Sequence, residues 1–267
     1  GIVVGMPGNF EHLPLKPEFS GGQFEREDYV IRSGLGGFWL LGATELAVEH
    51  ALWDLLHRLG YRQFFPGGTW EIVPKLDKIE VRIDISESPD FHARRIWYNW
   101  GMGWGYNREP YARWCARNRL AQGFSLHSGH AYGGILAANR AAFDANPAFY
   151  ALVDGRREHL GGDTKFCIAN PGLRKLVVDY AVEQVKARPE IDSISMDPSD
   201  GDNWCECDAC SRMGSVSDRV LTLANEVAAA INRLGLGPKY VGIYAYNRHS
   251  PPPSIAVHPH VIVSSTT

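Results

Sequence analysis

The sequence predicts an α/β protein in which a small N-terminal α/β domain precedes a (β/α) barrel of the TIM type. Short apolar segments with strand character alternate with amphipathic segments of helical period, and turns rich in glycine and proline separate them. After residue 88 the order becomes strand, loop, helix and repeats, and polar or aromatic clusters follow the predicted strands. We therefore predict domains at residues 1–88 and 89–267, with barrel strands one to six in the second and the barrel incomplete in this chain.

The first domain is expected to contain short strands and one long helix. Thr44 is a suitable N-cap for a helix that continues to Leu59, and Gly60 stands where a left-handed residue ends a helix. Residues 86–90 are polar, contain Pro89 and mark the predicted boundary. The strands and extended segments of this domain are predicted at residues 2–4, 29–32, 38–41, 61–65 and 79–85.

The second domain is expected to alternate strands with helices. Asn170 followed by Pro171 predicts the start of one helix, and Ser217 is the expected cap of another that ends at Gly235. A further helix is predicted over residues 111–120. The six barrel strands are predicted at residues 94–100, 123–126, 149–153, 191–196, 240–246 and 261–264.

Composition and missing motifs narrow the function. The net charge is -3 and no basic block occurs, which disfavours nucleic acid or an anionic membrane as partner. No apolar run approaches the roughly 20 residues of a membrane span, and the first residues lack the features of a signal peptide. Neither a glycine-rich phosphate loop nor a G-x-S-x-G elbow is present, so a nucleotide enzyme or a serine hydrolase is disfavoured.

Residues 193–210 carry the densest functional chemistry, because a buried strand leads there into acids and thiols. Asp197, Asp200 and Asp202 follow the predicted strand, where partial burial can tune a carboxyl group for acid or base catalysis. These positions are our expected catalytic residues. The alternative is that the acids only form turns and bind backbone amides.

Aromatic and polar side chains near the predicted barrel mouth indicate a neutral ligand such as a sugar. Flat tryptophan faces pack against sugar rings, and amide, imidazole and phenol groups bind hydroxyls. The alternative is core packing for the tryptophans and loop hydrogen bonding for the histidines. The expected substrate-binding residues are Trp97, Asn99, Trp100, Trp104, His127, His130, Trp204, Tyr246 and Asn247.

Three cysteines follow the acids as C-x-C-x-x-C, and a fourth stands earlier in the chain. Cys205, Cys207 and Cys210 together with Cys167 can supply four thiolates to a structural zinc ion, or two disulfides in an oxidising compartment. A structural role is favoured over a catalytic one, and no cofactor is required for the expected chemistry.

Several stretches together resemble a bacterial glycoside-hydrolase-like family, long described as a domain of unknown function, with members assigned as endo-β-N-acetylglucosaminidases. The stretch from Leu41 to Gly60 and the Phe-Pro-Gly at 65–67 resemble the small domain that precedes the barrel in α-glucuronidases and β-hexosaminidases. The Asp-Glu dipeptide of β-hexosaminidases is absent. The other matching stretches are residues 114–120, 127–130, 147–155, 167–171, 195–210, 217–219 and 225–227.

The resemblance implies a carbohydrate-active protein, extracellular or periplasmic, that acts on an N-acetylglucosamine-containing glycan. It places Asp200, the acid before a glycine, first among the catalytic positions. The leading hypothesis is thus a glycoside hydrolase with Asp200 as general acid, assisted by Asp197 or Asp202. A non-catalytic carbohydrate-binding protein and a structural zinc protein are the alternatives.

Overall fold

A computed structural model describes residues 1–19, 21–34, 36–94, 96 and 105–266 of the chain. The chain forms two compact units, Gly1–Phe124 and Ser125–Thr267. The predicted barrel strand at residues 94–100 falls almost wholly outside the described residues, as do Trp97, Asn99, Trp100 and Trp104. Among the helices that the structure describes, none has the length and apolar character needed to cross a membrane.

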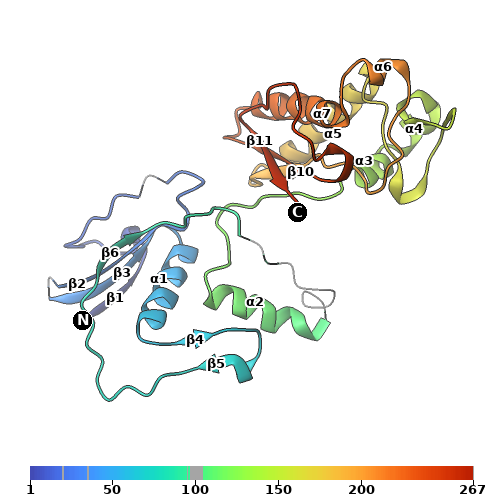
Figure 1. Cartoon of the computed structure of the whole chain (residues 1–267). Helices are drawn as coiled ribbons and strands as arrows, with labels where there is room; N and C mark the ends of the chain where they lie inside the picture. Colours follow the sequence, from blue (N-terminus) through green and yellow to red (C-terminus); the bar gives the residue numbers. More distant parts are fainter. Residues whose placement is uncertain (20, 35, 95, 97–104, 267) are drawn as a thin grey trace. The chain divides into compact units, whose positions relative to one another are not determined.

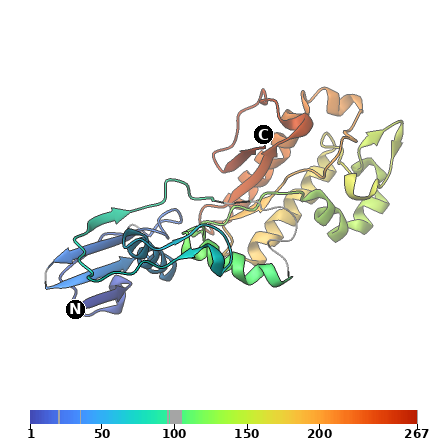
Figure 2. The ribbon, with the colours of Figure 1, turned by 60° about the horizontal axis from the view of Figure 1, so that its bottom comes forward.

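The first unit is built on a mixed sheet whose described strands run in the order β1-β3-β2-β6. Strand β3 pairs in parallel with β1 and antiparallel with β2, and β6 pairs antiparallel with β2. Helix α1 packs on this sheet beside β3 and β2 (Figures 1 and 2). The elements are β1 (Ile2–Gly5), β2 (Tyr29–Gly34), β3 (Gly37–Gly42), α1 (Glu45–Arg58), β4 (Arg62–Gln63), β5 (Glu71–Ile72), β6 (Asp84–Glu87) and α2 (Arg108–Arg117), with 3-10 turns at Pro7–Asn9, Gly68–Trp70 and Gly105–Asn107.

The predicted caps of α1 are confirmed. The Thr44 hydroxyl accepts the amide of Ala47 at 3.2 Å, and Gly60 has a φ of 100°. Glycine is favoured there because other residues adopt this left-handed region with strain. The apolar face of α1 buries Ala47 and Ala51 against the sheet. The predicted strand at residues 79–85 is shorter and later than expected, because only Asp84–Glu87 pairs with β2.

The first unit extends to Phe124, beyond the boundary predicted at residue 88. Side chains after that point are tied to the first unit. The Trp114 indole donates to the carbonyl of Gln63 at 3.0 Å, and Arg117 forms an ion pair with Glu71 at 2.8 Å. Contacts between residues so far apart cannot be recognised in the sequence. The polar, proline-containing segment at 86–90 can be recognised, and it led to the earlier boundary.

The second unit contains a parallel sheet with the order β11-β10-β9 within the described residues. Helix α7 packs against β10, β11 and α5, and Figure 1 shows α5 and α7 side by side. The core is formed by α3, α5, α7 and the sheet, with Leu173, Val227 and Val241 fully buried. The elements are α3 (Tyr132–Ala138), α4 (Arg140–Ala145), β7 (Leu152–Val153), β8 (Arg156–Arg157), α5 (Pro171–Ala187), β9 (Ser193–Ser195), α6 (Asp208–Ser211), α7 (Val216–Asn232), β10 (Tyr240–Ala245) and β11 (Val261–Ser265), with 3-10 turns at Pro147–Phe149, Gly161–Asp163 and Asn247–His249.

The α/β class is confirmed, and so are three predicted parallel strands as β9, β10 and β11. The described residues form no closed barrel. The strand predicted at 149–153 is instead a 3-10 turn followed by β7, which pairs antiparallel with β8 around Asp154-Gly155. Residues 123–126 form no strand, although the segment they enter lies beside β9 through side-chain hydrogen bonds.

Candidate functional site

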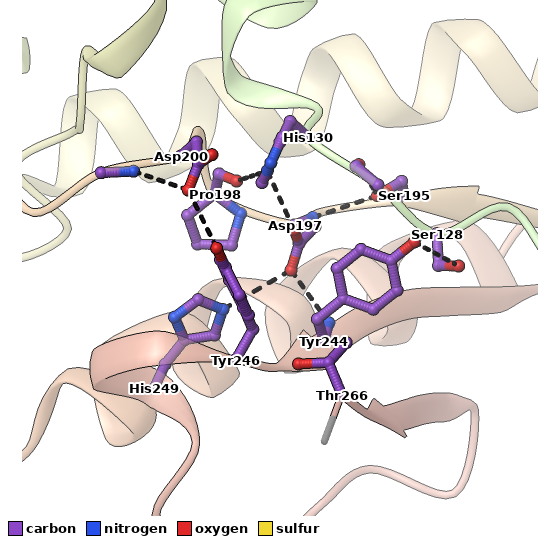
Figure 3. A network of polar contacts seen from close by, with 12 residues as sticks. Ser128, His130, Ser195, Asp197, Pro198, Asp200, Tyr244, Tyr246, His249 and Thr266 are labelled. Carbon is purple, nitrogen blue, oxygen red and sulfur yellow. Dashed lines mark hydrogen bonds and ion pairs between the residues drawn. The ribbon is translucent and has the colours of Figure 1, made fainter. Parts of the chain in front are cut away.

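The site lies where β9 and β10 end. These strands run in parallel with Val241 opposite Ile194 and Gly242 opposite Ser195, so the residues that follow both strands emerge at one edge of the sheet. The loop after β9 is residues 196–204, which we call the acid loop, and β10 leads into Tyr246 and the turn Asn247–His249. Figure 3 shows the side chains of both loops converging around Asp197.

Asp197 is fully buried, at 0% exposure. Its Oδ1 accepts the amide of Tyr244 at 2.9 Å and lies 3.6 Å from Nε2 of His249, while its Oδ2 lies 3.2 Å from Nδ1 of His130. Its carbonyl also accepts the amide of Ala131 at 2.8 Å. Asp197 therefore has no solvent-facing atom with which to reach a ligand, and it acts on the loops that surround it.

Residues 125–131 run beside β9 and deliver the histidines. The Ser193 hydroxyl donates to the carbonyl of Ser125 at 2.7 Å and accepts the amide of His127 at 2.6 Å. The Ser195 hydroxyl donates to the carbonyl of Gly129 at 2.6 Å. Hydrogen bonds from serine hydroxyls thus take the place of backbone strand pairing along this edge of β9. They hold the segment that places His130 over Asp197. A cavity of about 270 Å³ borders His127 and His130.

Asp200 is exposed and sits at the outer side of the acid loop. Its Oδ1 accepts the amide of Gly201 at 2.8 Å and the Tyr246 hydroxyl at 3.4 Å. The bond from the Gly201 amide, with smaller contributions from His130, Tyr246 and Lys165, lowers the pKa of Asp200 below its ordinary value. Asp200 is therefore ionised at neutral pH, which suits a base, a nucleophile or a charge stabiliser better than a general acid.

Lys165 is buried beneath the acid loop at 1% exposure. Its ammonium donates to the carbonyl of Asp200 at 2.5 Å and lies 5.2 Å from the ring centroid of Trp204. Burial lowers the pKa of Lys165, and the carboxylates of Asp163, Asp200 and Asp202 oppose that effect. The lysine therefore places a positive charge beneath the acidic loop and holds its main chain.

The outer side of the acid loop borders a second cavity of about 520 Å³. Asp202, Trp204 and Arg248 are among the residues that line it. The Trp204 indole nitrogen is buried and has no hydrogen-bond partner among the described residues. This cavity thus combines an aromatic face and a carboxylate from the acid loop with a guanidinium from the turn after β10.

The four cysteines converge directly after the acid loop. The sulfur atoms of Cys167, Cys205, Cys207 and Cys210 all lie within 4.8 Å of one another. The Sγ atoms of Cys167 are 3.7 Å from Cys207 and 3.8 Å from Cys210, and those of Cys205 and Cys207 are 3.4 Å apart. This cluster can hold a metal ion.

Polar groups surround the sulfur atoms. The amide of Leu152 donates to Sγ of Cys205 at 3.3 Å, and the amide of Ala169 donates to Sγ of Cys210 at 3.4 Å. Against the effect of burial, interaction with the thiols of Cys167 and Cys207 raises the pKa of the Arg157 guanidinium from β8. Amide donors and a guanidinium around sulfur are suited to stabilising negative thiolates.

The structure brings together only part of the predicted site. His130, Asp197, Asp200 and Tyr246 form one contact network, and Trp204 joins it through the 5.6 Å ring contact with His249. His127 borders the smaller cavity, Asp202 the larger one, and Asn247 is exposed with a φ of 49°. Trp97, Asn99, Trp100 and Trp104 lie outside the described residues.

Sequence reasoning missed His249, Lys165 and Arg157. His249 follows a predicted strand by a few residues, and its position after Tyr246 is a usable signal. Lys165 and Arg157 carry no such signal, because each reaches the site from a loop or hairpin whose course the sequence pattern does not define.

Comparison with known proteins gives a family without a described activity. No curated protein matches the chain. A family model described as a domain of unknown function, DUF4838, matches residues 65–267, which include the acid loop and all four clustered cysteines. The chain therefore belongs to the DUF4838 family.

Proposed function

We propose that this protein is a glycoside hydrolase acting on an N-acetylglucosamine-containing glycan in an extracellular or periplasmic location. The observation that carries the proposal is Asp200, an exposed and ionised carboxylate at the carboxyl edge of a parallel sheet. Ligands of α/β proteins bind at this edge. The resemblance to glycoside-hydrolase-like proteins supports the choice of substrate class, and the three parallel strands are compatible with part of a barrel.

Glycosidic cleavage needs a group that protonates the leaving oxygen and a carboxylate that attacks or stabilises the anomeric carbon. Asp200 suits the second role because its pKa is lowered, so we revise its expected role as general acid. Asp202 borders the larger cavity beside Trp204, whose ring offers a flat face to a sugar. Asp197 is buried and supports the site from beneath.

The test is release of glycan from an N-glycosylated glycoprotein by the wild-type chain and by Asp200→Asn. We expect the variant to lose about 10²-fold or more in kcat, since the amide keeps the shape but removes the charge. Asp179→Asn is the matched control, because Asp179 lies on α5 in an exposed ion pair with Lys175. Equal activity of Asp200→Asn and wild type would remove Asp200 from the mechanism.

The same experiment separates a non-catalytic carbohydrate-binding protein from an enzyme. Such a protein would bind the glycan in calorimetry without turnover and would lose binding in Trp204→Ala.

For the cysteine cluster we infer a structural zinc ion. A tetrahedral ion with Zn–S bonds of about 2.3 Å places its sulfur ligands about 3.8 Å apart. The sulfur atoms lie within 4.8 Å of one another, with separations of 3.4, 3.7 and 3.8 Å around this value, and backbone amides donate to two of them as they do to zinc thiolates. The ion would join the segment of Cys167 to the end of the acid loop, and so hold that loop in place.

Metal analysis of chain purified without chelator is the corresponding test. We expect about one zinc per chain in wild type and a large loss in Cys210→Ser, because removal of one thiolate opens the site. Cys115→Ser is the control, since Cys115 is the cysteine outside the cluster. Metal-free wild-type protein, or disulfides among the four cysteines in mass spectrometry, would contradict the zinc assignment.

A further inference from the structure

The position of the ring hydrogen on His130 follows from its neighbours. Nδ1 lies 2.6 Å from the carbonyl oxygen of Pro198 and 3.2 Å from Oδ2 of Asp197. A carbonyl and a carboxylate accept hydrogen bonds and do not donate them. Nδ1 must therefore carry the hydrogen, and in the neutral ring Nε2 has a free lone pair.

The two partners differ in exposure. The His130 side chain is 44% exposed, whereas that of Asp197 is 0% exposed. Figure 3 shows the His130 ring above Asp197 with Asp200 beside it. Nδ1 thus binds the Pro198 carbonyl with Oδ2 of Asp197 beside it, and the His130 residue borders the cavity of about 270 Å³.

Asp197 is itself fixed by bonds on several sides. Its Oδ1 accepts the Tyr244 amide of β10, and its own amide donates to the Ser195 hydroxyl at 3.1 Å. The backbone of Ala131, next to His130, donates to the Asp197 carbonyl. The Asp197 carboxylate and the backbone beside His130 are therefore held together at the edge of β9.

We propose that His130 is the acid–base group of the site around the acid loop and that Asp197 is its positioning residue. The inference rests on the proposed glycoside hydrolase function and supplies the proton donor that an ionised Asp200 cannot be. With Nδ1–H committed to the Pro198 carbonyl, Nε2 is the ring nitrogen left to pass a proton to or from a ligand.

In the first half of the reaction the Asp200 carboxylate forms a bond to the anomeric carbon, and the bond from that carbon to the leaving oxygen breaks. The leaving oxygen keeps the electron pair and takes the proton from Nε2 of the His130 imidazolium. In the second half water bonds to the anomeric carbon, its proton passes to Nε2, and Asp200 is released as carboxylate. The sum is hydrolysis with no other reactant.

Charged and titratable groups lie near His130 on several elements, and Tyr180 and Arg188 line the cavity of about 270 Å³ with it. Asp197 and Asp200 face it from the acid loop, and Lys165 lies beneath both carboxylates. From the segment after β10, Tyr246 contacts Asp200 and His249 lies 3.6 Å from Asp197. The pH dependence of activity therefore reflects all of these side chains together. The test needs variants that change one nitrogen atom of His130 at a time.

The variant His130→Asn keeps the hydrogen-bond donor of His130 but removes the nitrogen atom that would transfer the proton. The Asn amide nitrogen can replace Nδ1 as donor to Pro198 and Asp197, but the variant has no counterpart of Nε2. With the N-glycosylated glycoprotein as probe, we expect kcat to fall about 10²- to 10⁴-fold with KM changed by less than about threefold. His159→Asn, at an exposed position, should keep wild-type activity. An active His130→Asn enzyme would overturn the proposal.

Asp197→Asn tests positioning without removing the imidazole. The expected result is an altered His130 tautomer in long-range ¹H–¹⁵N spectra, a lower kcat and a displaced pH profile, because an amide donor can now face Nδ1. In wild type the neutral His130 ring should carry its hydrogen on Nδ1. The opposite tautomer in wild type would overturn the proposal whatever the activity.

A second measurement tests His130 even if the protein is not a glycoside hydrolase. If wild type releases no glycan, the hydrolase proposal fails for that probe, and diethyl pyrocarbonate then tests His130 directly. This reagent acylates unprotonated imidazole nitrogen. Fast modification of His130 that slows in Asp197→Asn would support the acid–base pair, and equal rates in both proteins would overturn it.

Discussion

Gly242 in β10 sets how closely the histidine segment approaches the sheet. A Cβ atom at this position would lie 2.2 Å from the carbonyl oxygen of His127. That oxygen belongs to the backbone of residues 125–131, which the serine hydroxyls of β9 fix in place. The requirement for glycine is therefore steric contact with the segment that carries His130, since its φ is not in the left-handed region.

Gly242→Ala should lower the free energy of unfolding by about 1–3 kcal/mol, because a backbone segment must move to admit the methyl group. Urea unfolding of the whole chain measures the change. Gly133→Ala is the control: Gly133 lies in α3 with no atom within 4 Å of the added carbon, so its replacement should be neutral or stabilising by up to about 1 kcal/mol. Equal stability of Gly242→Ala and wild type would mean that residues 125–131 are not held against β10.

At the residue scale, Asp197 and Asp200 could both be predicted from the sequence as candidate catalytic residues, but their different roles could not. Both follow the same strand three positions apart, and both lie in turn-forming contexts. Their difference comes from burial, 0% exposure for Asp197 against an exposed Asp200, and from partners in β10 and in residues 125–131. Such partners depend on tertiary packing.

Helix α7 shows at the element scale how a cap also fixes a loop. The Ser215 hydroxyl accepts the amide of Asp218 at 3.1 Å, and the Asp218 carboxylate accepts the amide of Ser215 at 2.8 Å, which forms a capping box. The same carboxylate accepts the amide of Ser254 at 2.6 Å. The start of α7 is thereby joined to the loop between β10 and β11.

Asp218→Asn should destabilise the chain at neutral pH by about 1–2 kcal/mol, and the deficit should shrink in acid. Hydrogen bonds, first from the Ser215 hydroxyl and then from the Ser254 and Ser215 amides, lower the pKa of Asp218. A lowered folded-state pKa gives stability that is present above the unfolded value of about 3.9 and is lost as the pH falls below it.

Urea unfolding at pH 7 and pH 3 checks this dependence. Asp144→Asn provides the control, because its exposed (i, i+4) pair with Arg140 should change stability by no more than about 0.5 kcal/mol. A deficit for Asp218→Asn that stays the same at both pH values would show that the charge of Asp218 is not what stabilises the cap.

Helix caps were the most predictable feature of the elements, because they depend on residues close in sequence. The Asn170 side chain accepts the amides of Gly172 and Leu173 at the start of α5, as predicted. The cap predicted for α7 was two residues late: Ser215 is the cap, and the Ser217 hydroxyl instead donates to the carbonyl of Pro251 at 2.6 Å. A serine can serve either purpose, and only the distant loop decides.

At the scale of the whole molecule, the chain has two compact units with separate cores. Tyr29, Ile31 and Leu40 belong to one core, and Phe143, Val227 and Ile231 belong to the other. The second unit contains both the acid loop and the cysteine cluster. The family match spans this unit and the end of the first.

The amino-acid sequence was enough to predict the α/β class, the helices α1, α5 and α7, the three parallel strands and four cysteines as a possible ligand set. These follow from local periodicity, caps and spacing, which short segments encode. Folding of the whole chain was needed to set the unit boundary at Phe124, the antiparallel hairpin of β7 and β8, the burial of Asp197 and the position of Lys165. Each of these depends on contacts between residues far apart in the chain, whose partners are chosen by packing and leave no periodic trace.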